Sequence, residues 1–264
     1  MTQRDPFAIA DKNVLVTGGT AGIGLGVARH FVETGARVVI TGRRKSGDDI
    51  ADEIGAHFVA MDVADPGSVT RGMALAAKRL NGEIHVLILN AGVGLSAGPI
   101  DELDLDTFKQ TFSVNVFGVV QGLRDGLRYM QEGASVIITS SPAGTIFVPG
   151  NVGYNASKAA VNALTQTCAL ELGPKGIRVN AVIPGMVETE LSLNPDDNEA
   201  ETEVVRTMTA TGRVRQPAEM GPIFQFLASD ASAPMTGSLV ACDDGLTAGF
   251  SVELLEKAFG GAEP

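Results

Sequence analysis

The sequence predicts an α/β fold, a single domain built on a doubly wound, seven-stranded parallel sheet with helices on both faces. Two observations support this prediction. Short runs of apolar and β-branched residues alternate with longer segments of helical spacing along the chain, which is the order that β-α-β units produce. Most of these runs are continuously apolar, as expected for strands that are buried on both sides.

Seven segments match the strand pattern. They cover residues 13–18, 37–41, 57–63, 86–92, 135–141, 177–185 and 239–245. Apolar residues at helical spacing follow three of them, over residues 22–35, 67–80 and 157–173. Because crossovers between parallel strands are right-handed, such units wind into one sheet that is covered on both faces.

The 264 residues suffice for one large domain over residues 1–264, and no internal repeat or linker divides them. Two segments depart from the alternation. Residues 188–212 are acidic and longer than a usual connection, so we expect them to form a lid over a binding site. Residues 250–264 form a C-terminal tail.

Charge and composition exclude several classes of partner. The net charge of −11 argues against nucleic acid and anionic membranes, and no run of eighteen apolar residues occurs. The two cysteines, Cys168 and Cys242, have no metal-ligand spacing. We expect a cytoplasmic protein with free thiols and no metal site.

A glycine-rich stretch, Thr17–Gly24, follows the first predicted strand and opens a helical pattern. Gly18, Gly22 and Gly24 let the backbone turn tightly and approach a ligand without a Cβ atom between them. The N–H groups and the positive dipole end of the helix point to the same place, which suits a pyrophosphate. Any tight turn could use such glycines, but their place in a first β-α unit favours dinucleotide binding.

Tyr154 and Lys158 lie four residues apart in the stretch YNASK, at the start of a helical pattern. They would share one helix face. An ammonium within about 4–6 Å lowers the pKa of a tyrosine by roughly 1–3 units, so Tyr154 could exchange a proton with a substrate oxygen. The alternative is an ordinary pair on a solvated helix face. Ser141 upstream and the glycine turn favour the chemical interpretation.

These motifs, in this order, resemble the compact branch of the short-chain dehydrogenase/reductase family over residues 13–249. The resemblance implies a Rossmann fold and a catalytic tetrad of Asn115, Ser141, Tyr154 and Lys158. In the family, the tyrosine transfers a proton and the serine binds the same substrate oxygen. The lysine binds the nicotinamide ribose, and the asparagine holds a water that links the lysine to solvent.

The resemblance also implies the residues that bind the cofactor. They are Gly18, Thr20, Gly22, Ile23, Gly24, Arg43, Arg44, Asp62, Val63, Asn90, Ala91, Gly92, Tyr154, Lys158, Pro184, Gly185, Val187 and Thr189. Asp62 matches the position that contacts adenine, and Thr189 the position that holds the nicotinamide carboxamide. The sequence departs from the family pattern at Leu89, where a second asparagine is more frequent, and at residues 243–245, where Asp-Asp-Gly replaces Asp-Gly-Gly.

The end of the second strand predicts which nicotinamide cofactor binds. Family members that prefer NAD usually carry an acidic residue there, where this chain has Gly42 followed by Arg43 and Arg44. A carboxylate would repel a 2′-phosphate, whereas guanidinium groups bind it. We therefore expect NADP(H) to be preferred, with NAD(H) possible. The alternative is that both arginines are solvated loop charges.

The residues that flank the tetrad predict the substrate class. Pro142, Ala143, Val148, Met186 and Leu191 are apolar, which fits a neutral, fairly hydrophobic ketone or secondary alcohol. Two alternatives remain open: a 3-oxoacyl-[acyl-carrier-protein] reductase, which shares every motif, and a catalytically silent dinucleotide-binding redox sensor. The family resemblance further implies a homotetramer, with a dimer as the second choice.

Overall fold

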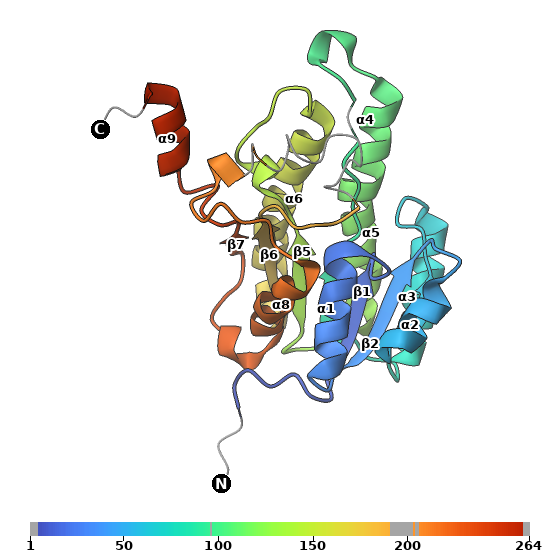
Figure 1. The fold of residues 1–264 in the computed structure, drawn as a ribbon. Coiled ribbons are helices and arrows are strands. Elements are labelled where there is room, and N and C mark those ends of the chain that lie inside the picture. The colour runs from blue at the N-terminus through green and yellow to red at the C-terminus, as the bar shows by residue number, and fades with distance from the viewer. Residues whose placement is uncertain (1–4, 96, 191–202, 204–205, 261–264) are drawn as a thin grey trace.

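The computed structural model describes residues 5–95, 97–190, 203 and 206–260. Seven strands in this part of the chain form one parallel sheet in the order β3-β2-β1-β4-β5-β6-β7 (Figure 1). The strands are β1 (Asn13–Thr17), β2 (Arg37–Gly42), β3 (His57–Ala60), β4 (Val86–Leu89), β5 (Ser135–Thr139), β6 (Arg178–Pro184) and β7 (Leu239–Cys242). The predicted fold class is confirmed.

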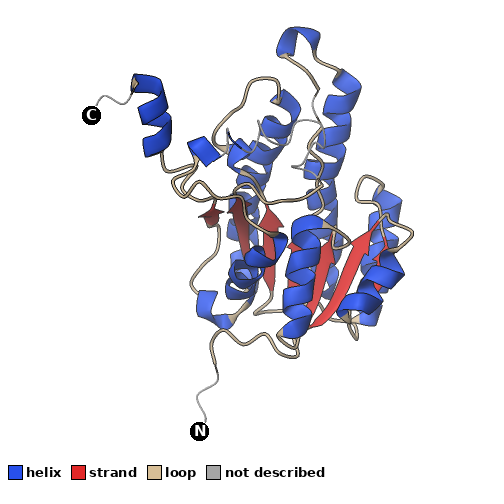
Figure 2. Ribbon diagram, viewed as in Figure 1, coloured by secondary structure: helices blue, strands red, loops and turns tan. Residues whose placement is uncertain are grey.

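Helices cover both faces of the sheet (Figure 2). They are α1 (Gly22–Glu33), α2 (Gly47–Ile54), α3 (Pro66–Arg79), α4 (Leu105–Phe112), α5 (Gly118–Gly126), α6 (Val152–Leu172), α8 (Gly221–Ala228) and α9 (Val252–Phe259). Helices α1, α2 and α8 contribute to the core on one face, and α3, α5 and α6 to the core on the other. The helix α9 stands away from the body of the domain (Figure 1).

The strand β1 shows why continuous apolar runs predicted buried strands. Val14 and Val16 pack into one core and Leu15 into the other, and all three are fully buried. Each strand therefore needs apolar side chains on both faces. Three of the predicted strands, 57–63, 86–92 and 239–245, are each three residues longer than β3, β4 and β7, because the chain leaves the sheet there and continues into loops.

The order of the strands places a crevice at one edge of the sheet. The chain winds outward from β1 to β3 and then crosses back to β4 on the other side of β1. Connections therefore leave the carboxyl ends of β1 and β4 in opposite directions, and ligands of doubly wound sheets bind at such a switch point. The glycine-rich turn follows β1 here, and Asn90 follows β4.

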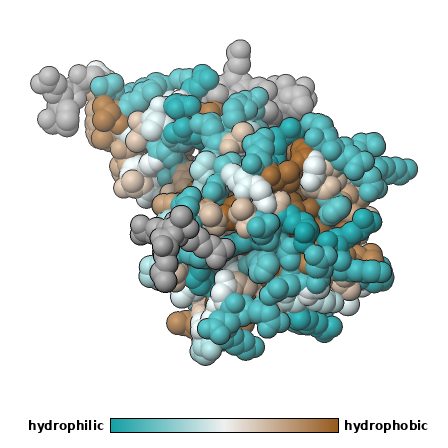
Figure 3. All heavy atoms as spheres, turned by 90° about the horizontal axis from the view of Figure 1, so that it is seen from below, coloured by the Kyte–Doolittle hydropathy of each residue, from teal (hydrophilic) through white to brown (hydrophobic). Residues whose placement is uncertain are grey.

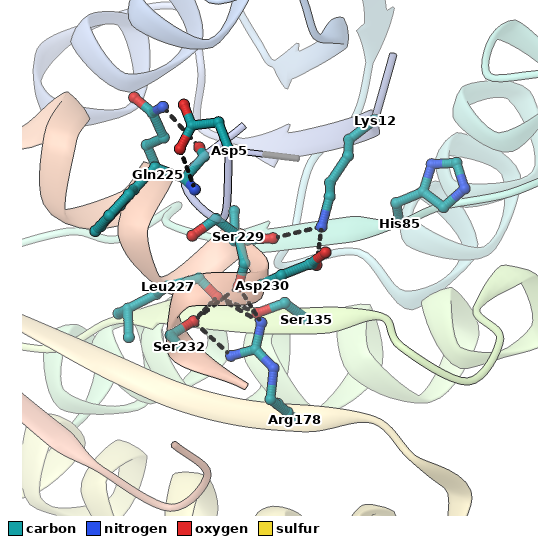
Figure 4. A network of polar contacts seen from close by, with 12 residues as sticks. Asp5, Lys12, His85, Ser135, Arg178, Gln225, Leu227, Ser229, Asp230 and Ser232 are labelled. Atoms are coloured by element: carbon teal, nitrogen blue, oxygen red, sulfur yellow. Dashed lines mark hydrogen bonds and ion pairs between the residues drawn. The ribbon is translucent and has the colours of Figure 1, made fainter. Parts of the chain in front are cut away.

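A polar network stabilises the opposite edge, at the amino ends of β5 and β6 (Figure 4). Arg178 donates hydrogen bonds to the main-chain oxygens of Leu227 at 2.9 Å and Ser229 at 3.3 Å, and to Ser232 Oγ at 3.0 Å. Ser135 Oγ donates to the same Leu227 oxygen at 2.8 Å. This network holds the end of α8 against the sheet.

The surface is mostly hydrophilic on the face seen from below, with hydrophobic side chains in scattered groups (Figure 3). Several large apolar side chains on α4, α6 and the turn between α4 and α5 are well exposed, among them Leu105, Phe117 and Leu170. No helix in the described residues combines the length and the apolar content that spanning a bilayer requires.

Candidate active site

The glycine-rich turn after β1 forms a cradle that larger residues would fill. A Cβ atom on Gly24 would lie 2.3 Å from the Gly18 oxygen, and one on Gly18 would lie 2.8 Å from Ala91 Cα. Gly18 also has a φ of +67°, which favours glycine. No side chain caps the first turn of α1, and that turn carries no acidic residue. This end of α1 therefore suits the pyrophosphate of a dinucleotide.

Asn90 connects the glycine turn to the centre of the sheet. Its amide nitrogen donates to the main-chain oxygens of Thr17 at 3.2 Å and Gly18 at 3.3 Å. Its amide oxygen accepts from Thr139 Oγ1 at 3.1 Å. The N–H groups of Asn90 and Ala91 both donate to Thr17 Oγ1. These hydrogen bonds hold the glycine-rich turn in place against Asn90.

Lys158 is the next member of this chain of contacts. Its side chain is buried, and Nζ donates to the main-chain oxygen of Thr139 at 3.0 Å. Burial lowers the pKa of Lys158 from 10.5 to about 8, because the charged form loses its hydration. A Cβ atom on Gly92 would lie 3.7 Å from Nζ. Hydrogen bonds thus link the glycine turn to the predicted catalytic lysine through Asn90 and Thr139.

Asn115 lies in a π-helical turn, Ser113–Phe117, between α4 and α5. Its side chain is buried and makes three hydrogen bonds. The amide oxygen accepts from Val93 N at 2.8 Å, and the amide nitrogen donates to Val93 O at 2.9 Å and to Ser157 Oγ at 3.1 Å. The side chain therefore holds the segment after β4 against α6. The water contact that the family resemblance implies stays a prediction.

Ser141 and Tyr154 come together at the carboxyl end of β5. Ser141 Oγ accepts from Ala143 N at 3.2 Å, and the Ser141 side chain lies close enough to Tyr154 to favour the charged form of its phenol. The turn after Ser141 packs on α6, since a Cβ atom on Gly144 would lie 2.6 Å from Asn162 Nδ2. Ser140 Oγ donates to Asn162 Oδ1 at 2.6 Å. These contacts fix the serine relative to the tyrosine.

We expected Lys158 to lower the pKa of Tyr154, and in the protein chain without cofactor this expectation is wrong. Lys158 Nζ lies 5.6 Å from the centre of the Tyr154 ring, so the two side chains do share a helix face. However, burial raises the pKa of Tyr154 above its ordinary value, and the nearby Ser141 side chain only partly opposes this rise. Desolvation of the phenolate therefore outweighs its stabilisation by the protein's own groups.

The residues expected around the adenosine lie at the ends of β2 and β3. Gly42 ends β2, and a Cβ atom there would lie 2.7 Å from Thr20 Oγ1. An aspartate at this position would therefore have to displace Thr20. Arg43 and Arg44 follow and are exposed. After β3, Asp62 accepts from Ala64 N at 3.0 Å, and Val63 packs beside Gly118.

The segment after β6 crosses toward the glycine turn. A Cβ atom on Gly185 would lie 2.7 Å from Asp243 Cα, and a Cβ atom on Gly22 would lie 3.1 Å from Thr189 Cγ2. Val187 is buried and forms a parallel bridge with Arg215. Pro184 ends β6. The structure therefore gathers this segment, the glycine turn and the tetrad at the same edge of the sheet.

Part of the predicted substrate region lies outside the described residues. This is true of Leu191 and of most of the predicted lid, residues 188–212. Of the other flanking residues, Pro142 is buried, Ala143 and Met186 are half-buried, and Val148 is exposed. The C-terminal tail contacts the end of the lid region, because Lys257 Nζ donates to Thr207 Oγ1 at 2.8 Å and to Glu203 at 3.0 Å.

Sequence reasoning missed several residues that support the site. Thr17 and Thr139 are buried polar residues at the last positions of β1 and β5, and a hydroxyl that ends an apolar strand is a signal that could have identified them. Ser157 binds Asn115. Arg215 donates two hydrogen bonds, of 2.8 and 2.5 Å, to Asp244. These bonds hold Arg215 in place, and its main chain pairs with Val187.

Known proteins resemble this chain over almost its full length. A family model described as enoyl-(acyl carrier protein) reductase matches residues 18–247. The NADP-dependent (R)-specific alcohol dehydrogenase of Lentilactobacillus kefiri is 37% identical over 249 residues, which cover 90% of this chain and 97% of that protein. The 3-alpha-(or 20-beta)-hydroxysteroid dehydrogenase of Mycobacterium bovis is 36% identical over 258 residues, with coverages of 96% and 94%.

Solved structures share the fold. A short-chain dehydrogenase from Burkholderia cenocepacia, crystallised in complex with NADP, superposes with a TM-score of 0.83 at 31% sequence identity. The superposition covers 90% of this chain and 99% of that one. The elements that carry the candidate site thus occur in the same arrangement in both molecules.

Proposed function

Because the chain belongs to the short-chain dehydrogenase/reductase family, we propose that it transfers a hydride between NADP(H) and a neutral, fairly hydrophobic ketone or secondary alcohol. Members of the family that resemble it act on CH–OH or C=O groups, as the names alcohol dehydrogenase and hydroxysteroid dehydrogenase state. The observation that carries the proposal is the position of the buried Lys158, whose Nζ lies 5.6 Å from the centre of the Tyr154 ring, with the Ser141 side chain near the same tyrosine.

In carbonyl reduction, Tyr154 donates a proton to the substrate oxygen. Its raised pKa suits this direction, because the phenol keeps its proton at neutral pH. Ser141 binds the same oxygen. Since Ser141 Oγ already accepts from Ala143 N, its own proton is available to donate to the substrate.

In alcohol oxidation, Tyr154 must first lose its proton. Lys158 contributes a positive charge beside the ring, because a pKa of about 8 leaves it mostly protonated at neutral pH. When bound, the nicotinamide supplies or accepts the hydride, and its oxidised form adds positive charge. We assign the acidification of Tyr154 to both charges acting together, since Lys158 alone does not outweigh desolvation.

The residues at the end of β2 support NADP(H) as the preferred cofactor. Gly42 leaves no carboxylate at this position, and Arg43 and Arg44 offer guanidinium groups at its rim. The alcohol dehydrogenase of L. kefiri is NADP-dependent by name. The glycine turn would hold the pyrophosphate, Asp62 the adenine, and Lys158 and Thr189 the nicotinamide half.

The remaining assignments extend the same proposal. We infer that residues 188–212 form the substrate lid and that the C-terminal tail anchors its end through Lys257. We also infer a cytoplasmic homotetramer, which the exposed apolar side chains on the helices that carry Asn115 and Tyr154 support.

The chain contains only two tyrosines, which provides a matched test. Tyr154→Phe removes the proton donor, and we expect the rate of ketone reduction to fall by about 10²–10⁴-fold while NADPH still binds. Tyr129→Phe, at the half-buried second tyrosine, should keep wild-type turnover. The measurement is a panel of hydrophobic ketones and an acetoacetyl thioester, assayed with NADPH and with NADH.

Each outcome of this panel has a clear meaning. Turnover of ketones with NADPH that is lost only in the Tyr154 variant would support the proposal. Substantial activity in Tyr154→Phe would refute the proton-transfer role, and a preference for the thioester would identify an acyl-carrier-protein reductase instead.

A further inference from the structure

The segment that follows β6, residues 185–190, passes the glycine-rich turn and forms an ion pair with Arg44 through Glu190. Arg44 Nη2, at the end of β2, donates to a carboxylate oxygen of Glu190. Arg44 is one of the two arginines to which we assigned the 2′-phosphate of NADP(H), so this inference rests on the proposed function. Its neighbour Arg43 makes no ion pair among the residues that the structure describes. The Glu190 carboxylate thus occupies an anion position on one of the two arginines.

The position of Glu190 follows from anchors earlier in the segment. Glu188 N donates to Arg215 O at 2.8 Å, and Arg215 N donates to Met186 O at 2.9 Å. Arg215 is itself held by its two hydrogen bonds with Asp244. The segment therefore leaves its anchor at Glu188 with a defined direction.

Between the anchor and the ion pair, the segment passes over the start of α1. Thr189 lies so close to Gly22 that a Cβ atom on the glycine would be 3.1 Å from Thr189 Cγ2. The chain thus runs from the end of β6, over the turn that suits a pyrophosphate, to the end of β2. The segment thus contacts the glycine-rich turn and Arg44, and a bound dinucleotide would contact both of them.

We propose that Glu190 competes with the 2′-phosphate of the cofactor for Arg44. To bind Arg44 Nη2, the 2′-phosphate of NADP(H) must displace the Glu190 carboxylate, and at the other N–H groups of Arg44 it would lie close to that carboxylate and be repelled by it. NAD(H) has no 2′-phosphate and leaves the pair intact. Glu190 is therefore a specificity-determining residue that weakens the binding of the phosphorylated cofactor.

The exposure of the pair sets the size of the effect. The side chains of Arg44 and Glu190 are 45% and 71% exposed. Exposed ion pairs contribute about 0.2–1 kcal/mol, which corresponds to about a 1.5- to 5-fold change in affinity. Salt screens such pairs, so the difference should be largest at low ionic strength.

Calorimetric titration of the full chain with 2′,5′-ADP and with ADP tests the competition without any turnover. We expect Glu190→Gln to bind 2′,5′-ADP about 1.5- to 5-fold more tightly than wild type at low salt, with ADP binding unchanged. Glu188→Gln is the matched control. It removes the same charge two residues away, where the carboxylate binds Gln216 and not Arg44.

Arg44→Ala separates this inference from the cofactor assignment. If wild type prefers 2′,5′-ADP and Arg44→Ala loses the preference, the cofactor assignment stands. In that case, equal affinities of the Glu190 and Glu188 variants would overturn the competition alone. Weaker binding of both ligands by Glu190→Gln would overturn it too, because the pair would then be closing over the bound adenosine. If Arg44→Ala changes neither ligand, the inference fails together with the assignment of the 2′-phosphate to Arg44, and the assignment to Arg43 is left to stand alone.

Discussion

Among single residues, Lys158 shows how burial lowers the pKa of a charged side chain. The side chain is only 6% exposed, and its ammonium donates to one main-chain oxygen, that of Thr139. The folded protein still carries the charge at neutral pH, although burial has lowered the pKa of Lys158 from 10.5 to about 8. A difference of this size corresponds to a destabilisation of about 3 kcal/mol. Burial of this charged side chain therefore costs stability, a cost that the proposed catalytic role of Lys158 would explain.

Lys158→Met should therefore raise the free energy of unfolding while it abolishes turnover. We expect a gain of up to about 3 kcal/mol at neutral pH, where both the folded and the unfolded wild type are protonated. Between about pH 8 and 10.5 the unfolded wild type binds more protons than the folded one, so wild-type stability rises and the gain shrinks. Urea unfolding at about pH 7 and 9.5 measures both effects.

The exposed Lys175 provides the control for this substitution. Lys175→Met should change the free energy of unfolding by less than about 0.5 kcal/mol at either pH. A Lys158 variant that is less stable than wild type at both pH values would contradict the assigned cost of burial.

Among the elements, β6 contributes to the fold and to the candidate site at its two ends. Its carboxyl end leads into the segment that crosses the cofactor cradle, and its amino end carries Arg178. Burial lowers the pKa of Arg178, while the nearby Asp230 opposes this change. Three hydrogen bonds to the end of α8 and the turn after it compensate for the loss of hydration (Figure 4). One side chain of β6 thus helps to hold the end of α8 against the sheet.

Removal of this guanidinium group should destabilise the domain. Arg178→Met leaves the oxygens of Leu227, Ser229 and Ser232 with fewer donors, and we expect the free energy of unfolding to fall by about 2–3 kcal/mol. The matched control is Arg128→Met, because the Arg128 side chain is 64% exposed and lies 3.9 Å from Asp125. The control should stay within about 0.5 kcal/mol of wild type. Equal losses in the two variants would show that the network does not stabilise α8.

For the whole molecule, the apolar surface bears on assembly. Leu170 on α6 is 81% exposed, and Phe117 beside Asn115 is 65% exposed. Contiguous apolar patches on a protein surface mark interaction sites, and we propose that these exposed side chains belong to such a patch. The helices that hold the predicted catalytic residues would then also form the contacts between subunits.

Leu170→Asp should split the proposed homotetramer into smaller species, because a charge at a contact surface remains unpaired after burial. Light scattering coupled to size-exclusion chromatography measures the mass of wild type and variant. Leu75→Asp is the control, since Leu75 is 54% exposed on α3, away from α6. A wild type that elutes as a monomer would refute the assembly.

Much of this protein follows from local sequence patterns. Continuous apolar runs such as residues 13–17 determined the buried strands, and the alternation with helical spacing determined their parallel arrangement. Spacing of four residues put Tyr154 and Lys158 on one helix face, because helix periodicity is a local property. Motif order alone predicted that the glycine turn, Ser141 and Tyr154 belong to one site, and the structure does place them at one edge of the sheet.

Other properties depend on groups that are distant in the sequence and adjacent only after folding. The pKa of Tyr154 is raised because packing removes water from its phenol group and so disfavours the charged form, and no local pattern reports that loss. Asn90 meets Thr139 and Arg44 meets Glu190 across 49 and 146 residues of chain. Sheet order and the path of the segment after β6 bring these partners together, so only the tertiary structure decided them.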